Sequence, residues 1–143
     1  TTVSICLSKG LGAPLGSLIC GDEDAMGRAL RIRKLYGGGM RQAGIVAAAG
    51  LYALEHNLKP LADDHRRADD LSQCLAAIPG VEVDRPDTNL VFFRLADDHP
   101  LQGANLSARL AEAGLLVAAM GNQFRAALHR DINDAQAQAA GAI

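Results

Sequence analysis

Residues 4–17 read Ser4-Ile5-Cys6-Leu7-Ser8-Lys9-Gly10-Leu11-Gly12-Ala13-Pro14-Leu15-Gly16-Ser17, with one lysine between an apolar segment and a loop of small residues. Alternating, β-branched-rich residues predict strands over 3–7 and 16–21. The glycines fit neither the dinucleotide fingerprint nor the phosphate-binding loop in spacing, so they indicate tight turns beside a ligand. The segment therefore predicts two strands joined by a tight loop that carries Lys9.

Lys9 is the first candidate for chemistry. A lysine in a loop is usually a solvated surface residue. Here the residues before it are apolar and those after it are small, which leaves little to solvate the amine. A neutral lysine amine is what nucleophilic attack on an aldehyde requires. Lys9 is therefore a candidate Schiff-base lysine, with a plain surface lysine as the alternative.

Two helices are predicted after the second strand. Asp22 is a suitable N-cap for a helix over about 23–35, and the triple glycine at 37–39 ends it. Over 42–54 nearly every residue is small or apolar, so this second helix has no polar face and we expect it to be buried all round. Such a helix requires other protein around it.

The second half of the chain has a mixed pattern. Pro60 is placed as the first residue of an amphipathic helix whose charged cluster at 63–67 faces water. Strands are expected over 81–83, 89–95, 115–118 and 124–129, with a short helix around Leu106 and Leu110 and a final helix capped by Asn133. We expect two domains: residues 1–56 and a small α+β domain over 57–143.

Composition excludes several classes of function. The net charge is −2, with 14 basic residues scattered among 16 acidic ones, and aromatic residues make up 3%, so nucleic acid is not expected as a partner. No apolar run approaches the ~18 residues that a membrane helix needs. Three scattered cysteines favour a reducing, cytoplasmic setting. The histidines, which lack metal-ligand spacing, are His56, His65, His99 and His129.

Residues 4–17, together with Arg33-Lys34, Gly37-Gly38-Gly39-Met40-Arg41-Gln42-Ala43-Gly44 and the helix at 47–54, resemble the low-specificity L-threonine aldolase family. The resemblance is strong over residues 1 to about 65 and weaker beyond. It implies the carboxyl-terminal part of an α/β, aspartate-aminotransferase-like fold type I enzyme, comprising the end of the large-domain sheet and a small α+β domain. Its cofactor would be pyridoxal 5'-phosphate, and it would split L-threonine or L-allo-threonine into glycine and acetaldehyde.

The resemblance also implies roles for individual residues. Lys9 matches the family's Schiff-base lysine, and Arg125 matches an arginine that pairs with the substrate carboxylate. Strand alternation puts Arg125 on the face away from the core. Lys34 and Arg41 match positions near the cofactor phosphate or the substrate, in some cases across a subunit boundary. The alternatives are a surface ion pair for Arg125 and solvated cations for Lys34 and Arg41.

The chain begins without Met and closes within a helical pattern, so we expect it to be a piece of a longer protein. The resemblance implies a homo-oligomer and an amino-terminal segment that supplies the groups around the cofactor ring, so residues 1–143 alone are expected to be inactive. Two other readings stay open. One is a related enzyme such as phenylserine aldolase or serine hydroxymethyltransferase, and the other is a non-catalytic assembly fragment.

Overall fold

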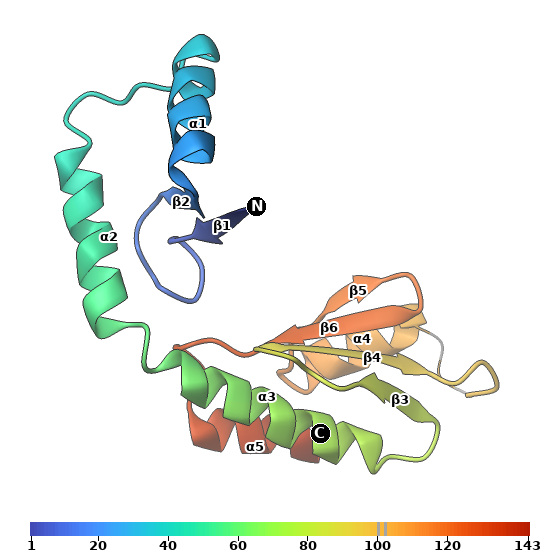
Figure 1. Ribbon diagram of the computed structural model, residues 1–143. Helices are drawn as coiled ribbons and strands as arrows, with labels where there is room; N and C mark the ends of the chain where they lie inside the picture. Colours follow the sequence, from blue (N-terminus) through green and yellow to red (C-terminus); the bar gives the residue numbers. More distant parts are fainter. Residues whose placement is uncertain (100, 102) are drawn as a thin grey trace. The chain divides into compact units, whose positions relative to one another are not determined.

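A computed structural model of the protein describes residues 1–99, 101 and 103–143. The chain divides into two compact units, Thr1–Lys59 and Pro60–Ile143, each with its own set of strands and helices (Figure 1). Among the residues that the structure describes, no helix is long and apolar enough to span a membrane. The assignment of residues 1–56 and 57–143 to the large and small domains of a complete enzyme stays a prediction.

The first unit begins with a β-hairpin. Strand β1 (Thr2–Cys6) pairs with β2 (Ser17–Gly21) in antiparallel register, with Thr2 opposite Gly21 and Cys6 opposite Ser17. Helix α1 (Glu23–Leu35) follows directly, because the Asp22 side chain caps it by accepting a hydrogen bond from the Ala25 amide at 2.8 Å. The predicted strands and helix are thus present, with ends shifted by a residue or so.

Glycine ends α1 as the sequence predicts. Gly37 adopts a φ of +76°, which favours a residue without a Cβ atom. Its amide donates to the Lys34 carbonyl at 3.1 Å, and the Gly38 amide donates to the Arg33 carbonyl at 2.7 Å. These two bonds form a Schellman motif that satisfies the last carbonyls of the helix.

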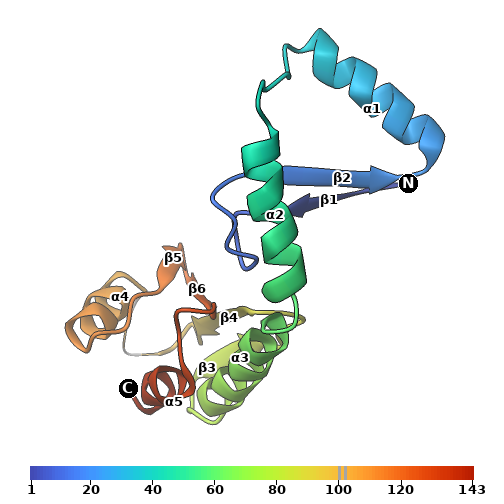
Figure 2. The same cartoon turned by 90° about the vertical axis from the view of Figure 1, so that its left-hand side faces the viewer.

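Helix α2 (Gly44–His56) runs beside the hairpin loop (Figure 2). The expectation that it is buried all round is wrong for this chain, since only Gly50 and Ala53 are buried. Ile45 is 79% exposed and Leu51 61% exposed. The helix is apolar on every side, but this unit supplies a neighbour for only one of those sides. Apolar exposure of this extent is typical of a surface that other polypeptide covers.

The second unit is a four-stranded antiparallel sheet with helices on one face. The strand order is β3-β4-β6-β5, comprising β3 (Val81–Asp84), β4 (Leu90–Leu95), β6 (Gln123–Ala127) and β5 (Ala118–Met120). Helices α3 (Leu61–Ala76) and α5 (Asp134–Ala142) pack on each other, α3 also contacts β3 and β4, and α4 (Gly103–Glu112) contacts β5. Among the described residues of this unit, none forms a helix on the other face of the sheet (Figure 1).

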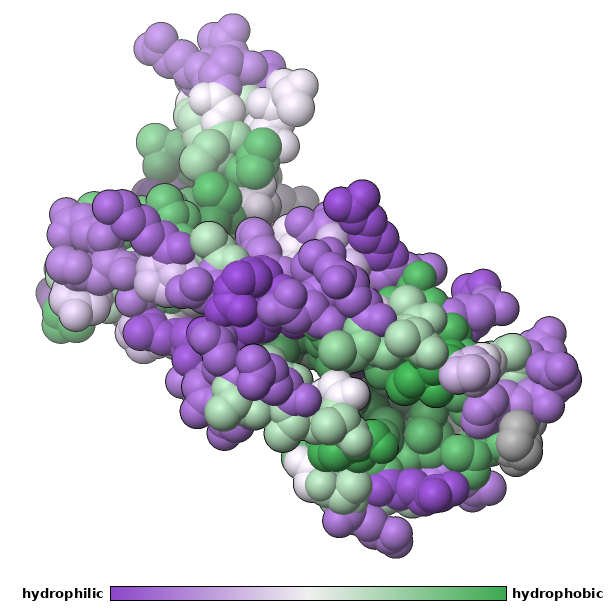
Figure 3. Space-filling model, turned by 90° about the horizontal axis from the view of Figure 1, so that it is seen from below, coloured by the Kyte–Doolittle hydropathy of each residue, from purple (hydrophilic) through white to green (hydrophobic). Residues whose placement is uncertain are grey.

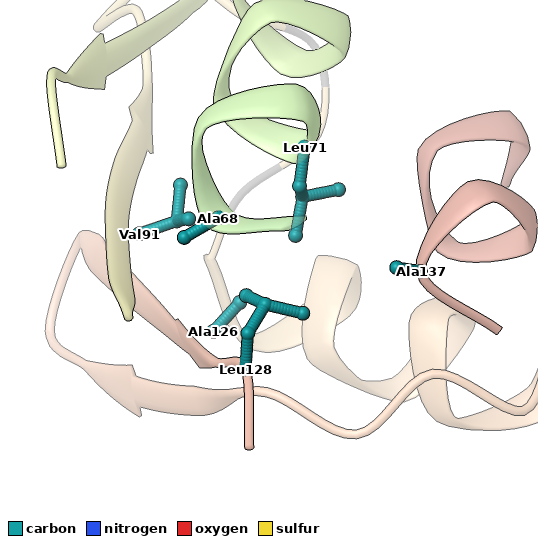
Figure 4. Packing of buried hydrophobic residues seen from close by; sticks show 6 residues of the cluster. All are labelled: Ala68, Leu71, Val91, Ala126, Leu128 and Ala137. Carbon is teal, nitrogen blue, oxygen red and sulfur yellow. The ribbon is translucent and has the colours of Figure 1, made fainter. Parts of the chain in front are cut away.

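The core of this unit lies between the sheet and α3 and α5. It consists of six buried residues, shown in Figure 4: Ala68, Leu71, Val91, Ala126, Leu128 and Ala137. Beside them is an apolar cavity of about 230 Å³, which opens on the underside of the unit (Figure 3). Its lining includes Leu75, Phe93, Leu106 and Leu110.

Three local predictions need correction. Strand β5 lies at Ala118–Met120 rather than 115–118, because Gly121, at a φ of +64°, places the tight turn to β6 directly after Met120. β6 ends at Ala127, although the Leu128 amide still donates to the Asn89 carbonyl at 2.9 Å. Pro60 is the residue before α3 rather than its first residue. Asn133 does cap α5, through a reciprocal capping box with Gln136.

The prediction that residues 63–67 all face water is wrong for Asp64, whose side chain is 3% exposed. Arg67, one turn further along α3, lies 3.3 Å from the Asp64 carboxylate. The same guanidinium donates to Asp134 in α5 at 2.6 Å, and Arg66 donates to Asp134 at 2.7 Å. These charges join α3 to α5, which sequence spacing along α3 does not reveal.

Candidate functional site

The loop between β1 and β2 is a closed structure with Lys9 at its turn. The Leu7 amide donates to the Gly16 carbonyl at 2.9 Å, and the Ala13 amide donates to the Leu7 carbonyl at 3.0 Å. At the tip, the Gly12 amide donates to the Lys9 carbonyl at 2.8 Å. Gly12 and Gly16 have φ angles of +70° and +123°, so the predicted tight turns need glycine there.

Helix α2 holds this loop in place. The Asn57 side chain, at the end of α2, donates to the Leu11 carbonyl at 2.7 Å. Leu7 and Leu11 are each only 6% exposed. A Cβ atom at Gly50 would lie 3.1 Å from Leu7 Cδ1, so the absence of a side chain at Gly50 lets the loop approach the helix. The backbone that carries Lys9 is therefore fixed by buried contacts.

The Lys9 side chain itself is exposed in this chain, so the expectation that little would solvate it is wrong here. Ser8, the residue before Lys9, is exposed and polar, and it contacts Cys6 at the end of β1. The Cys6 Sγ and Ser8 Oγ atoms lie 3.4 Å apart. Hydrogen bonding from the Ser8 side chain, then from its backbone, holds the pKa of the Cys6 thiol below its usual value, and the charge of Lys9 adds to this. The loop thus presents an accessible amine on a rigid backbone.

A second group of cations lies at the far end of α1 and before α2. Lys34 and Arg41 are both exposed and lie on either side of the triple glycine. A Cβ atom at Gly39 would be 4.0 Å from Lys34 Nζ, so the ammonium group lies over bare backbone. Gln42 has a φ of +52°, an uncommon conformation for a residue with a side chain. A cation next to exposed peptide groups can bind an anion.

Arg125 lies in the second unit, on the face of the sheet that carries no helix. Phe124 and Ala126 are buried, whereas Arg125 and Ala127 are exposed, so the predicted alternation along β6 is confirmed. No carboxylate pairs with Arg125 among the side chains that the structure describes. The alternative of a surface ion pair therefore finds no support within this chain.

Within the first unit, Lys9 is not brought together with Lys34 and Arg41. The loop that carries Lys9 lies beside α2. Residues 34–41 lie at the carboxyl-terminal end of α1, which is the end remote from the hairpin (Figures 1 and 2). Arg125 belongs to the other unit. Over residues 1–99, 101 and 103–143, no group of three or more His, Cys, Asp or Glu side chains is arranged to hold a metal ion.

Two residues that shape the site were not singled out from the sequence. Asn57 reads as an ordinary helix C-terminal residue, and its partner Leu11 is 46 positions away. Gly50 lies in an alanine-rich helix, where a glycine lowers helix propensity. This unfavourable glycine is the feature of the sequence that could have identified the position. A destabilising glycine on one side of an apolar helix indicates close packing against another segment.

Comparison with known proteins decides the family. The sequence profile of the family described as "Beta-eliminating lyase" matches residues 2–98, more than half of the chain. The chain belongs to this family. The predicted resemblance to low-specificity threonine aldolases is confirmed by relatives of that name.

Two relatives show how much of a family member this chain represents. A low-specificity L-threonine aldolase of Escherichia coli strain K12 is 50% identical over 96 residues, which is 67% of this chain and 28% of that protein. A low-specificity L-threonine aldolase of Arabidopsis thaliana is 40% identical over 134 residues, which is 92% of this chain and 37% of that protein. The chain therefore spans about a third of the length of these curated relatives.

Solved structures agree on the fold. A putative L-allo-threonine aldolase from Listeria monocytogenes matches 99% of this chain and 43% of its own, with a TM-score of 0.75 at 15% identity. Aminotransferases are among the other structures that match, so the predicted aspartate-aminotransferase-like fold type I class is confirmed. At this identity the likeness shows the fold of the beta-eliminating lyase chain and nothing finer.

Proposed function

We propose that this chain is the carboxyl-terminal part of a pyridoxal-phosphate-dependent aldehyde-lyase that cleaves L-threonine and L-allo-threonine to glycine and acetaldehyde. The observation that carries the proposal is the closed loop that presents Lys9, within residues 2–98, which match the beta-eliminating lyase family. Pyridoxal phosphate, when bound, supplies an acceptor for the electron pair released by the breaking Cα–Cβ bond.

Lys9 holds the cofactor in this proposal. Lys9 is exposed, and its backbone is anchored by the hydrogen bond from the Gly12 amide to the Lys9 carbonyl and by that from Asn57 to the Leu11 carbonyl. An unprotonated lysine amine can bond covalently to an aldehyde carbon. The same group, once released from the cofactor and protonated, can donate a proton to the substrate Cα, where the bond to Cβ has been broken. A rigid backbone under a flexible side chain suits both tasks.

Arg125 binds the substrate carboxylate in this proposal. A guanidinium offers two parallel N–H donors that fix a carboxylate in one orientation, which selective cleavage of one bond at Cα requires. Its position on the open face of the sheet, without a carboxylate partner among the described residues, leaves those donors available. The neighbouring carboxylates on that face bind other residues, since Glu82 pairs with Arg94 and Asp84 accepts a hydrogen bond from Gln123.

Lys34 and Arg41 bind an anion, most simply the cofactor phosphate of a second copy of the chain. They lie away from Lys9 within their own unit, so they do not serve the same loop. Together with the exposed α2, this supports a homo-oligomer in which one copy completes the site of another. We also propose that an amino-terminal segment supplies the groups around the cofactor ring, and that the enzyme is cytoplasmic, given its free cysteines.

Borohydride reduction tests the cofactor assignment. In the full-length protein that contains this chain, we expect a pyridoxyl group on Lys9 and none after Lys9→Arg. Lys59→Arg is the matched control, because Lys59 is exposed in the same unit. Residues 1–143 alone should show no turnover. An adduct at another lysine, or no adduct at all, would contradict the proposal, and the latter would favour an assembly fragment.

Arg125→Lys tests the substrate assignment. Loss of a bidentate charged contact costs about 1.5–3 kcal/mol, so we expect kcat/KM for threonine to fall roughly ten- to 150-fold. Arg130→Lys, an exposed arginine of the same unit, should change it little. Comparing turnover of threonine, phenylserine and serine, with and without a folate, separates this activity from phenylserine aldolase and serine hydroxymethyltransferase.

A further inference from the structure

The open face of the four-stranded sheet has a regular arrangement of side chains around Arg125. In one row, Asp84 on β3 is opposite Phe92 on β4, Phe92 is opposite Arg125 on β6, and Arg125 is opposite Ala118 on β5. Residues directly opposite each other in antiparallel strands share a face. Asp84, Phe92 and Arg125 therefore stand side by side, with the phenylalanine in the middle.

The adjacent row carries the other polar groups. Glu82, Arg94, Gln123 and Met120 are opposite one another in the same way. The Arg94 guanidinium pairs with the Glu82 carboxylate at 2.5 Å. Gln123 Nε2 donates to the Asp84 carboxylate at 3.4 Å, a diagonal contact that passes over β4. Each carboxylate of these two rows is thus bonded to a residue other than Arg125.

Without these contacts, Asp84 would be the carboxylate in this row that could pair with Arg125 and so compete with a substrate carboxylate. Neighbouring strands lie about 4.8 Å apart, so residues two strands apart in one row are roughly 10 Å apart at their backbones. That separation is within the combined reach of an aspartate and an arginine side chain. Phe92, which is half-buried, occupies the position between them. Its ring offers neither group a hydrogen bond and fills the path that an ion pair would need.

We propose that Phe92 and Gln123 are positioning residues that keep Arg125 free of Asp84, so that the guanidinium stays available for a substrate carboxylate. Phe92 separates the two side chains, and Gln123 holds the Asp84 carboxylate toward the adjacent row. This inference rests on the proposed role of Arg125 as the carboxylate-binding residue. It explains why Arg125 forms no ion pair with any described residue, although Glu82 and Asp84 lie on the same face of the sheet.

The first test is structural and does not depend on activity. In the 143-residue chain, Arg125 Nε–Hε exchange with water is followed by NMR in the wild type, Phe92→Ala and Gln123→Ala. We expect exchange in both variants to slow severalfold as Asp84 pairs with Arg125, and to return to the wild-type rate when Asp84→Asn is added. Phe92→Leu, which keeps an apolar wall, should resemble the wild type.

Folding of the variants is checked independently. Phe92 is on the face opposite the core, where Phe93 is buried, so its truncation should leave the amide spectrum of α3 and α5 unchanged. Should Phe92→Ala fail to fold, Gln123→Ala provides the same test by itself. Unchanged Arg125 exchange in the folded variants would overturn the inference, whatever Arg125 binds.

The second test uses turnover of threonine by the full-length protein. An exposed ion pair is worth up to about 1 kcal/mol, so competition from Asp84 should raise KM about two- to sixfold, with kcat unchanged. Adding Asp84→Asn should restore KM in Phe92→Ala and in Gln123→Ala. A raised KM that Asp84→Asn does not restore refutes the positioning role. A wild-type KM in Arg125→Lys refutes instead the proposal that Arg125 binds the substrate carboxylate. The NMR test of Phe92 and Gln123 does not depend on that outcome.

Discussion

Asn57 offers the sharpest test of how the Lys9 loop is held. Its side chain donates to the Leu11 carbonyl at 2.7 Å, and the two residues are 9% and 6% exposed. Asn57→Ala leaves that carbonyl buried without its partner, which costs about 1–3 kcal/mol. If the cost falls on the closed loop, the population of open loop rises roughly five- to 150-fold, since each 1.4 kcal/mol is about tenfold.

Native-state hydrogen exchange measures this change directly. The Gly12 and Ala13 amides, which bond to carbonyls within the loop, should exchange faster by the same factor. The Leu128 amide, bonded to Asn89 in the other unit, is the internal control and should not change. Asn57→Asp keeps the size of the side chain but removes the donor, so its effect should be at least as large.

The outcome that refutes the reasoning is specific. If Gly12 and Ala13 exchange at wild-type rates in both variants, while the spectrum shows an intact fold, then the loop is closed by its own backbone bonds and α2 does not hold it. Weaker retention of the pyridoxyl group by Asn57→Ala in the full-length protein would link the same contact to cofactor binding.

Three further predictions concern other contacts. Leu71→Ala should lower the stability of the second unit by about 2–5 kcal/mol in urea unfolding, whereas Leu116→Ala, at an 84% exposed site, should change it by no more than about 0.5 kcal/mol. Hydrogen bonds from two arginines of α3 hold the pKa of Asp134 below its usual range. The carboxylate therefore stabilises the fold at pH values above its unfolded-state pKa, and this contribution is lost as the pH falls through its folded-state pKa. Asp134→Asn should destabilise the protein at pH 7 and have no effect in acid. Ser8→Ala should raise the pKa of Cys6 and slow its alkylation at neutral pH, followed by mass spectrometry.

Much of the architecture follows from local sequence. The cap at Asp22, the glycine stop after α1 and the capping box at Asn133 each depend on residues within five positions of one another. The alternation that exposes Arg125 depends only on the period of a strand. Such features are readable without a structure, because the interacting groups are neighbours along the chain.

Other features depended on how distant segments meet. The contact between Asn57 and Leu11, the hydrogen bonds from Arg66 and Arg67 to Asp134, and the row that places Phe92 beside Arg125 join residues that are far apart in sequence. The apolar pattern of α2 predicted that it would be buried, but hydropathy does not say which polypeptide covers a helix. Hydrogen-bond partners and burial are set by through-space packing, and a linear pattern records only what each segment can offer to that packing.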